Sequence, residues 1–554
     1  MVQEIAAHRS SPQVRLERAG RRCGVLLAGL GLLAVCGDGG QTHAPRVEVG
    51  AEILIGELLD GETGLAVFRG IPYAAPPVGA LRWLPPAPHT PRRGHQAAVR
   101  FGPACPQLQG NPDWYRTVAQ GFGHPPDIVP DLEHISEDCL HLNVWSRNLG
   151  GEALQPVMVW IHGGSNRNGY AYEPNYLGGN LAQRGVVVVS LNYRLGALGF
   201  MAHPALTAES ERGVSGNYGI LDQIAALRWV RRNIEAFGGD PERVTVFGES
   251  SGAADIGTLI VSPLARGLFR RAIMQSGGFQ INSTQTLAAE EALGVQLMQA
   301  LDAGAGPDPL RSMRALPWRD LVAAVPRALP DHYYDAVIDG WLLPEPAASI
   351  LQRGEQSAVD ILIGSNANEW LMYVPDPAGE GDLQEAFSSY ALEEDRPAVL
   401  SALAAGGQTD VRMQLDRLIG SAEFHCPSKA LARAMRRVTD RVYFFRFSRV
   451  RPKGAALLAY HGAELPYVFD TADAWLPADP TDRALTDAML AYWVQFARAG
   501  DPNREGLRHW PVFDPVAEDF QDLGDEVRSR SGMERELCRI LDRKRSADVR
   551  AFAG

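Results

Sequence analysis

Short apolar runs rich in β-branched and aromatic residues constrain the fold of this chain most strongly. They are VMVWIHGG (157–164), GVVVVSLNY (185–193), RVTVFGES (243–250), VDILIGSN (359–366) and RVYFFRFS (441–448). The intervening stretch DQIAALRWVRRNIEAF (222–237) instead places its apolar residues at helical spacing. Apolar strands that alternate with helices predict an α/β fold with a mostly parallel central sheet flanked by helices. In such sheets, functional groups gather at the carboxyl ends of the strands.

One of these runs ends in a G-x-S-x-G motif, GESSG at 248–252, which precedes the small-residue stretch AADIG. Between a strand and a helix, this motif forms a turn so tight that its flanking positions accept only tiny side chains. The turn exposes the hydroxyl of its central residue, so we predict Ser250 as a nucleophile, with Glu249 beside the site. Ser251 is the alternative nucleophile, and a surface turn without a chemical role is the other interpretation.

A nucleophilic serine needs a base, and the base needs a carboxylate that orients it. Where a strand-to-helix turn carries the serine, the chain order is serine, acid, histidine. Glu369 follows the apolar run VDILI, and His461 follows RVYFFRFS, so they fit this order as acid and base. Among thirteen histidines, His162 belongs to another motif and His425 lies in a helix-like stretch. A solvated loop carboxylate and a capping imidazole remain the alternatives for the two residues.

A third motif ends the run VMVWI, where Gly163 and Gly164 follow His162. Glycines in this place allow backbone N–H groups to face a substrate oxygen, and the N–H of Ser251 supplies a further donor. We therefore predict an oxyanion hole here; a glycine turn without a role is the alternative.

Further segments match a known family in the same order along the chain, from about residue 47 nearly to the C-terminus. They include FRGIPYAAPPVGALRW (68–83), SEDCLHLNVW (136–145), LNYRLGALGF (191–200), the whole stretch 216–253, LFRRAIMQSG (268–277) and YWVQFARAGDPN (492–503). With these segments, the chain resembles the type B carboxylesterase/cholinesterase family of α/β-hydrolases. The resemblance implies a single α/β-hydrolase domain with large loop insertions over residues 47–554.

The same resemblance implies roles for individual residues. Ser250 would be the nucleophile, Glu369 the acid and His461 the base, and Ser276 in MQSG would lie close to them. It also implies two structural ion pairs, Arg82–Glu137 and Arg194–Asp222, and two disulfide bonds, Cys105–Cys139 and Cys426–Cys538. The first disulfide would close a loop that contains Trp114 and Tyr115 and resembles the wall at the entrance of the active site.

At several positions the chain departs from the family pattern. Ser165 stands where a third glycine is usual, so Gly164 and Ser165 would be the two donors of the loop, one of them with a side chain. Asn166 follows where an aromatic residue is common, Ser251 replaces an alanine, and Trp370 replaces a glycine. We expect these departures to reshape the oxyanion hole or the pocket.

The N-terminal segment differs in composition from the rest of the chain. Arginines at 9, 15, 18, 21 and 22 precede the apolar run CGVLLAGLGLLAV (23–35), which is shorter than the roughly twenty residues of a membrane-spanning helix. This pattern predicts a secretory signal over residues 1–35 and a short linker at 36–46. Cys36 resembles a lipoprotein cleavage site, although Val35 departs from it, and Arg21-Arg22 also fits a twin-arginine signal.

Composition narrows the remaining possibilities. The net charge of −12 and the lack of a basic cluster exclude a nucleic-acid partner, and 45% hydrophobic with 21% charged residues is typical of a globular protein. We therefore predict an exported hydrolase of small carboxylic esters, periplasmic or secreted, that acts through an acyl-enzyme without a metal or organic cofactor. Because Val129 replaces the tryptophan by which cholinesterases hold quaternary ammonium, a choline ester is not expected. The alternatives are a lipase or polyesterase on insoluble esters and an adhesion protein that has lost catalysis.

Overall fold

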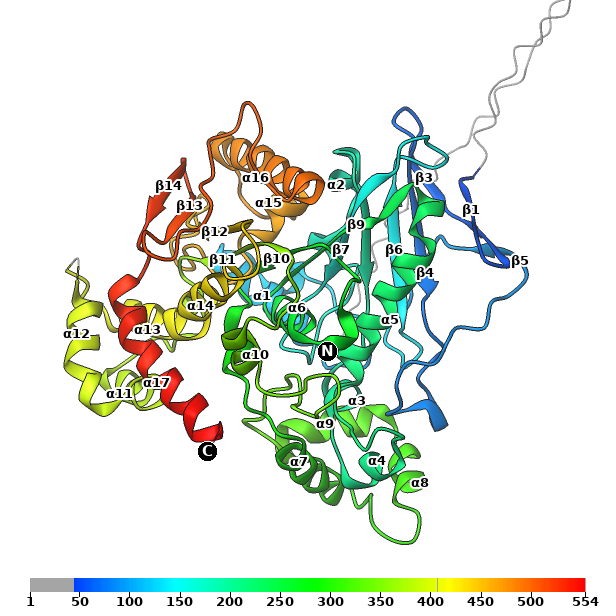
Figure 1. Cartoon of the computed structure of the whole chain (residues 1–554), viewed down its shortest axis with the longest axis horizontal. Coiled ribbons are helices and arrows are strands. Elements are labelled where there is room, and N and C mark those ends of the chain that lie inside the picture. Colours follow the sequence, from blue (N-terminus) through cyan, green and yellow to red (C-terminus); the bar gives the residue numbers. More distant parts are fainter. Residues whose placement is uncertain (1–43, 406, 554) are drawn as a thin grey trace, which may run out of the picture. The chain divides into compact units, whose positions relative to one another are not determined.

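The computed structural model describes residues 44–405 and 407–553 (Figure 1). The predicted secretory segment 1–35, Cys36 and the linker up to residue 43 lie outside the described residues. The first strand, β1, begins at Arg46, the last residue of the expected linker. It belongs to a small three-stranded sheet made of β1 (Arg46–Val49), β2 (Glu52–Ile55) and β5 (Gly94–Ala97).

An eleven-stranded mixed sheet forms the centre of the described residues (Figure 1). In spatial order its strands are β14 (Val527–Ser531), β13 (Asp519–Leu523), β12 (Val442–Phe447), β11 (Asp360–Asn366), β10 (Arg271–Gln275), β9 (Gly239–Glu249), β7 (Gln155–Ile161), β8 (Val187–Leu191), β6 (His141–Ser146), β4 (Leu65–Pro72) and β3 (Glu57–Asp60). All neighbours from β8 to β13 pair in parallel, whereas β14–β13 at one edge and β8–β6, β6–β4 and β4–β3 on the other side are antiparallel. The predicted α/β-hydrolase architecture, a mostly parallel sheet flanked by helices, is confirmed.

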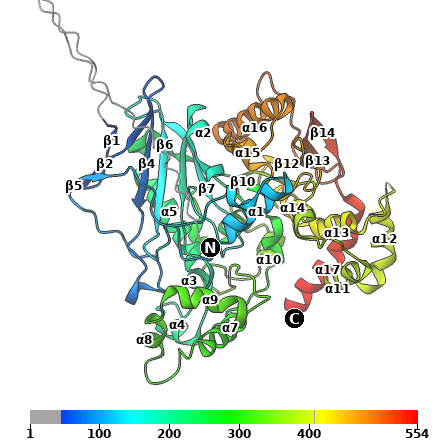
Figure 2. The same ribbon diagram turned by 180° about the vertical axis from the view of Figure 1, so that it is seen from behind.

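Helices cover both faces of this sheet and extend beyond it (Figures 1 and 2). They are α1 (Gly110–Gly121), α2 (Gly179–Gln183), α3 (Gly196–Phe200), α4 (Pro204–Glu209), α5 (Tyr218–Asn233), α6 (Ser251–Val261), α7 (Leu287–Ala300), α8 (Pro309–Arg314), α9 (Trp318–Ala328), α10 (Ala347–Arg353), α11 (Glu380–Tyr390), α12 (Arg396–Ala404), α13 (Val411–Gly420), α14 (Cys426–Met435), α15 (Leu465–Phe469), α16 (Pro480–Ala499) and α17 (Arg535–Ala553).

The apolar runs build two cores because successive residues of a strand point to opposite faces. Along β7, Val159 and Ile161 join a core that contains apolar residues of α5, α6, α10 and α14. The intervening residues Met158 and Trp160 join a second core with residues of α2, α15 and α16. Both faces of the strand are therefore buried, which explains why its sequence does not alternate with polar residues.

Two elements differ from the sequence expectation. The helix expected over 222–237 begins earlier, at Tyr218, and its last residues form a short 3-10 helix (Ile234–Phe237). Strand β10 is absent from the predicted strands because its apolar core is only Ala272–Met274, flanked by Arg271 and Gln275.

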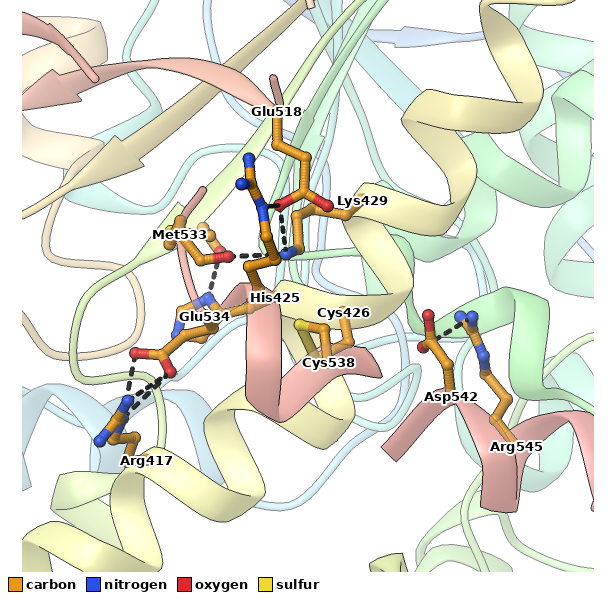
Figure 3. Close-up of a disulfide and its surroundings, with 12 residues drawn as sticks. Arg417, His425, Cys426, Lys429, Glu518, Met533, Glu534, Cys538, Asp542 and Arg545 are labelled. Atoms are coloured by element: carbon orange, nitrogen blue, oxygen red, sulfur yellow. Dashed lines mark hydrogen bonds and ion pairs between the residues drawn. A yellow bond between two sulfur atoms is a disulfide. The ribbon is translucent and has the colours of Figure 1, made fainter. Parts of the chain in front are cut away.

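A third apolar cluster lies outside the sheet and joins α11, α12, α13 and α17, which stand together in both views (Figures 1 and 2). The disulfide between Cys426 of α14 and Cys538 of α17 ties this layer to a helix that packs on the sheet (Figure 3). Among the helices of the described residues, none is long and apolar enough to cross a membrane.

Candidate active site

The G-x-S-x-G motif forms the predicted turn between a strand and a helix. Strand β9 ends at Glu249 and α6 begins at Ser251, so Ser250 alone makes the turn, with φ 54° and ψ −128°. A side chain at Gly248 would bring its Cβ to 2.7 Å from the carbonyl oxygen of Ile161, and one at Gly252 would collide with the same oxygen. The close backbone approach of β7 therefore requires both glycines of the motif.

The predicted acid and histidine lie in direct contact. His461 Nδ1 is 2.6 Å from Glu369 Oε2, and both side chains are buried. The other oxygen, Glu369 Oε1, accepts hydrogen bonds from the hydroxyl of Ser276, at 2.6 Å, and from the N–H of Asn366, also at 2.6 Å. Glu369 follows β11 and Ser276 follows β10, so the carboxyl ends of neighbouring parallel strands bring these groups together.

A second carboxylate faces the other ring nitrogen of the histidine. Glu249 Oε1 lies 3.0 Å from His461 Nε2, and Glu249 is 4% exposed. Burial raises the pKa of Glu249 to about 8, against the opposing charge of His461. Burial lowers the pKa of His461, but the charge of Glu249 and the hydrogen bond and charge of Glu369 outweigh it and raise this pKa to about 9. The imidazole thus lies between two carboxylates that favour its protonated form.

The loop after β7 brings its backbone N–H groups close to the turn. A Cβ at Gly163 would lie 2.7 Å from the carbonyl oxygen of Glu249 and 3.1 Å from Cβ of Ser250. Gly164 and Ser165 both have positive φ angles, of 107° and 58°. Within residues 44–405 and 407–553, the N–H groups of Gly164, Ser165 and Ser251 have no protein acceptor. These donors are free to bind an oxygen of a ligand.

A cavity of about 1120 Å³ joins these parts of the site. Ser250, Glu249, His461, Gly164 and Ser165 all contribute to its wall. Its remaining wall is aromatic and polar and is formed by residues that include Trp114, Phe279, Asn282, Tyr333, Asp335, Trp370, Tyr373, Glu423 and Phe424. The arrangement can therefore hold an organic molecule against a serine, an imidazole and a set of free N–H donors.

The structure brings together the predicted residues of the site, but several neighbours are unpredicted. Phe424, whose ring centroid lies 5.1 Å from that of His461, comes from the segment between α13 and α14. Asn282 and Asp335 come from connections after β10 and α9, which carry no recognisable motif. The neighbouring His425 bonds through Nδ1 to the hydroxyl of Ser365, at 2.6 Å, and does not line the cavity.

Both implied disulfide bonds, Cys105–Cys139 and Cys426–Cys538, are present. Helix α1, inside the first loop, contributes Trp114 to the wall of the cavity, in agreement with the expected position of this segment. The two implied ion pairs are also present.

Arg82 forms a bidentate ion pair with Glu137, and Arg194 forms another with the fully buried Asp222. The two N···O distances of each pair are 2.7 Å.

The sheet order and the strand-to-helix turn that carries Ser250 define an α/β-hydrolase. The model of the carboxylesterase family matches residues 46–541, and the chain therefore belongs to this family and is a carboxylic-ester hydrolase. A fumonisin B1 esterase of Sphingopyxis macrogoltabida is 36% identical, over 89% of each chain, and a para-nitrobenzyl esterase of Bacillus subtilis is 32% identical over 86% of this chain and 94% of its own. A crystal structure of a Geobacillus stearothermophilus carboxylesterase superposes with a TM-score of 0.76 at 32% identity, over 89% of this chain and 99% of its own.

Proposed function

We propose that the chain hydrolyses small carboxylic esters through an acyl-enzyme on Ser250, with His461 as the base and Glu369 as the residue that orients it. The observation that carries this proposal is the 2.6 Å contact between Glu369 and His461, whose imidazole lines the same cavity as Ser250. A serine on a strained turn that shares a cavity with a carboxylate-bound imidazole supports acyl transfer.

In the first half of the reaction, Nε2 of His461 accepts the proton of the Ser250 hydroxyl while Oγ attacks the ester carbonyl. The tetrahedral intermediate collapses, and the leaving alkoxide takes the proton from His461. In the second half, His461 deprotonates a water that attacks the acyl-enzyme; the second tetrahedral intermediate then breaks its bond to Ser250 Oγ, which takes the proton from His461, and the carboxylic acid product leaves. Glu369 holds the imidazole by Nδ1 and stabilises its positive form.

The oxyanion of both intermediates would accept hydrogen bonds from the N–H groups of Gly164, Ser165 and Ser251, while Gly163 permits the close approach of the loop. Loss of one such donor typically costs about 100- to 1,000-fold in rate. Ser276 holds the free oxygen of Glu369 and so fixes the carboxylate.

The wall of the cavity favours neutral or cationic esters over anionic ones. Among the described residues that line it, there are carboxylates such as Glu173, Asp335 and Glu423 but no Lys or Arg. An anionic substrate would meet carboxylates without a compensating cation, which costs binding energy in a partly dry site. The names of the relatives add fumonisin B1 and p-nitrobenzyl esters to the substrates worth testing.

A fluorophosphonate probe tests the proposal. We expect stoichiometric labelling of the wild-type protein, none of Ser250→Ala, and stoichiometric though slower labelling of Ser251→Ala. Labelling of Ser250→Ala equal to wild type would refute Ser250 as the nucleophile. Labelling that is lost only in Ser251→Ala would identify Ser251 as the nucleophile. Hydrolysis of p-nitrophenyl esters of increasing chain length, below and above their solubility limit, then separates an esterase from a lipase.

We also propose that the protein is exported. Two disulfide bonds suit an oxidising compartment, and the arginine-rich segment before a short apolar run suits a secretory signal. Expression with residues 1–35 should place the activity outside the cytoplasm. Deletion of these residues should keep the activity inside the cytoplasm. Membrane association that disappears in Cys36→Ala would assign a lipid anchor to that cysteine.

A further inference from the structure

Asn166, at the end of the oxyanion loop, is hydrogen-bonded by its backbone and its side chain to several separate segments. It is 1% exposed. Its N–H donates to Ser251 Oγ at 3.1 Å, and its Nδ2 donates to Asp255 Oδ1 at 3.1 Å and to the carbonyl oxygen of Tyr334 at 3.2 Å. Its own carbonyl oxygen accepts from the N–H of Gly196 at 2.6 Å. All of these groups hold one residue in place.

Two of these partners come from the first two turns of the helix that follows the nucleophile. Ser251 and Asp255 stand four residues apart at the start of α6, so their side chains share one face of the helix. Both are fully buried, and both bind Asn166. The helix that begins at the nucleophile thus holds the loop that carries the opposite side of the oxyanion hole.

The loop needs such support because its backbone is in an unfavourable conformation. Ser165 and Asn166 both lie in the left-handed region, with φ angles of 58° and 53°. This conformation is unfavourable for a residue other than glycine, and it persists only where the surroundings fix it. The candidate donors Gly164 and Ser165 directly precede Asn166, so any relaxation of this residue would move them.

Asp255 is suited to a structural contact with neutral partners. Its other oxygen, Oδ2, accepts a hydrogen bond from Gln223 of α5, and no described Lys, Arg or His lies within ion-pair distance. Burial raises the pKa of Asp255 to about 8, against the hydrogen bonds of Gln223 and Asn166. The Oε1 atom of Gln223 is buried without a partner, so this amide can be turned around to face a donor.

We propose that Ser251 and Asp255 act through Asn166 as a polar clamp that fixes the oxyanion loop against the nucleophile helix. The three residues are positioning residues for ester hydrolysis, and this inference rests on the proposed function of Ser250. Ser251 therefore acts twice: its N–H is a candidate donor to the oxyanion, and its hydroxyl positions the donors on the other side.

The first test removes each half of the clamp and leaves every backbone N–H in place. We expect Ser251→Ala and Asp255→Leu each to lower kcat by about 10- to 100-fold, because a displacement of the N–H donors by about 1 Å slows a reaction by factors of this size. KM should stay within about twofold of wild type. Ser146→Ala is the matched control, since Ser146 is a fully buried serine bonded to the carbonyl oxygen of Phe237, away from the cavity. Its kcat should equal that of wild type.

All rates are divided by the number of active sites titrated with the fluorophosphonate, and thermal unfolding is recorded for each variant. Inhibition by a trifluoromethyl ketone, which reports on oxyanion binding, should weaken in parallel with kcat. A kcat per titrated site equal to wild type in both clamp variants would overturn the inference while leaving the proposed nucleophile untouched. An equal loss in Ser146→Ala would also overturn it, because the effect would then follow stability alone.

Two further variants test the coupling. In Asp255→Asn the side chain keeps an acceptor for Asn166, and Gln223 can turn its free oxygen toward the new amide, so kcat should return to within about threefold of wild type. The double variant Ser251→Ala/Asp255→Leu should lose less than the product of the two single losses, because both act through one residue. Multiplicative losses, or an Asp255→Asn variant as impaired as Asp255→Leu, would contradict the clamp.

Discussion

Removal of the disulfide between Cys426 and Cys538 is expected to lower the free energy of unfolding by about 4.8 kcal/mol at 25 °C. The bond joins residues 112 positions apart, the first residue of α14 and a residue in the first turn of α17 (Figure 3). In the chain-entropy model, a cross-link of this span restricts the unfolded chain by that amount. The enclosed segment contains β12, α16 and the loop of His461, so its unfolding is coupled to that of the active site.

The folded state should tolerate the loss of the bond because other contacts hold the same two helices together. Lys429 of α14 donates to the carbonyl oxygen of Met533, just before α17, at 2.6 Å, and lies 3.2 Å from Glu518 (Figure 3). Leu537 and Ile540 of α17 are buried in the third apolar cluster, which joins α11, α12, α13 and α17. The loss of stability therefore comes mainly from the greater entropy of the unfolded chain. Activity of the folded variant should be close to wild type.

The measurement compares Cys426→Ala/Cys538→Ala with Cys105→Ala/Cys139→Ala as the matched control. Alanine is chosen over serine because all four positions are buried and a hydroxyl would lack a partner. The first pair spans 34 positions, for which the same model gives about 3.8 kcal/mol. Urea unfolding, followed by circular dichroism and tryptophan fluorescence, should rank the late bond above the early one by about 1 kcal/mol. The reverse order, or a loss below about 2 kcal/mol for the late bond, would refute this reasoning.

Three further predictions concern the site and its support. Gly252→Ala should destabilise the fold by more than about 3 kcal/mol, because its Cβ would collide with a backbone oxygen of β7; a variant with wild-type urea midpoint would contradict this. Glu249→Gln removes a charge 3.0 Å from His461, so the pKa of His461 falls. Because the base acts unprotonated, the acidic limb of the pH profile of kcat/KM should move by about one unit to lower pH, and an unmoved limb would be evidence against the charge effect. Asp222→Ala should cost about 3–5 kcal/mol in urea unfolding, since it leaves the buried Arg194 without a counter-charge; a cost below 1 kcal/mol would exclude this role.

The fold and the turn around Ser250 could be predicted from the sequence because both depend on local patterns. Apolar runs identify strands buried on both faces, and a G-x-S-x-G motif between a strand and a helix leaves little freedom for its central residue. Glu369 and His461 were harder, because chain order places each after a strand but says nothing of contact. Their 2.6 Å hydrogen bond depends on which strands are neighbours in the sheet.

The hydrogen-bond partners of Asn166 could not be predicted from the sequence. Its departure from the family pattern is visible in the sequence, and the spacing of Ser251 and Asp255 places these two on one face of a helix. Their common partner, however, lies 85 and 89 positions away along the chain. Only the parallel pairing of β7 with β9 brings the ends of those strands together and makes the three residues neighbours.

The same argument explains why the family identifies the reaction and leaves the ester open. Ser250 and Glu369 lie just after the ends of β9 and β11, whose positions are fixed by backbone hydrogen bonds to both neighbours, and His461 lies in the loop after β12, where Glu369 holds its imidazole. The opposite wall of the cavity comes from segments outside the sheet: Trp114 from α1, Phe279 and Asn282 from a short helical segment after β10, and Phe424 from the segment before α14. These segments are held by local packing and by the two disulfide bonds, so their side chains can change without disturbing the strand ends. Selectivity among esters should therefore respond to substitutions in this wall through KM, while kcat depends on the strand ends and on the clamp at Asn166.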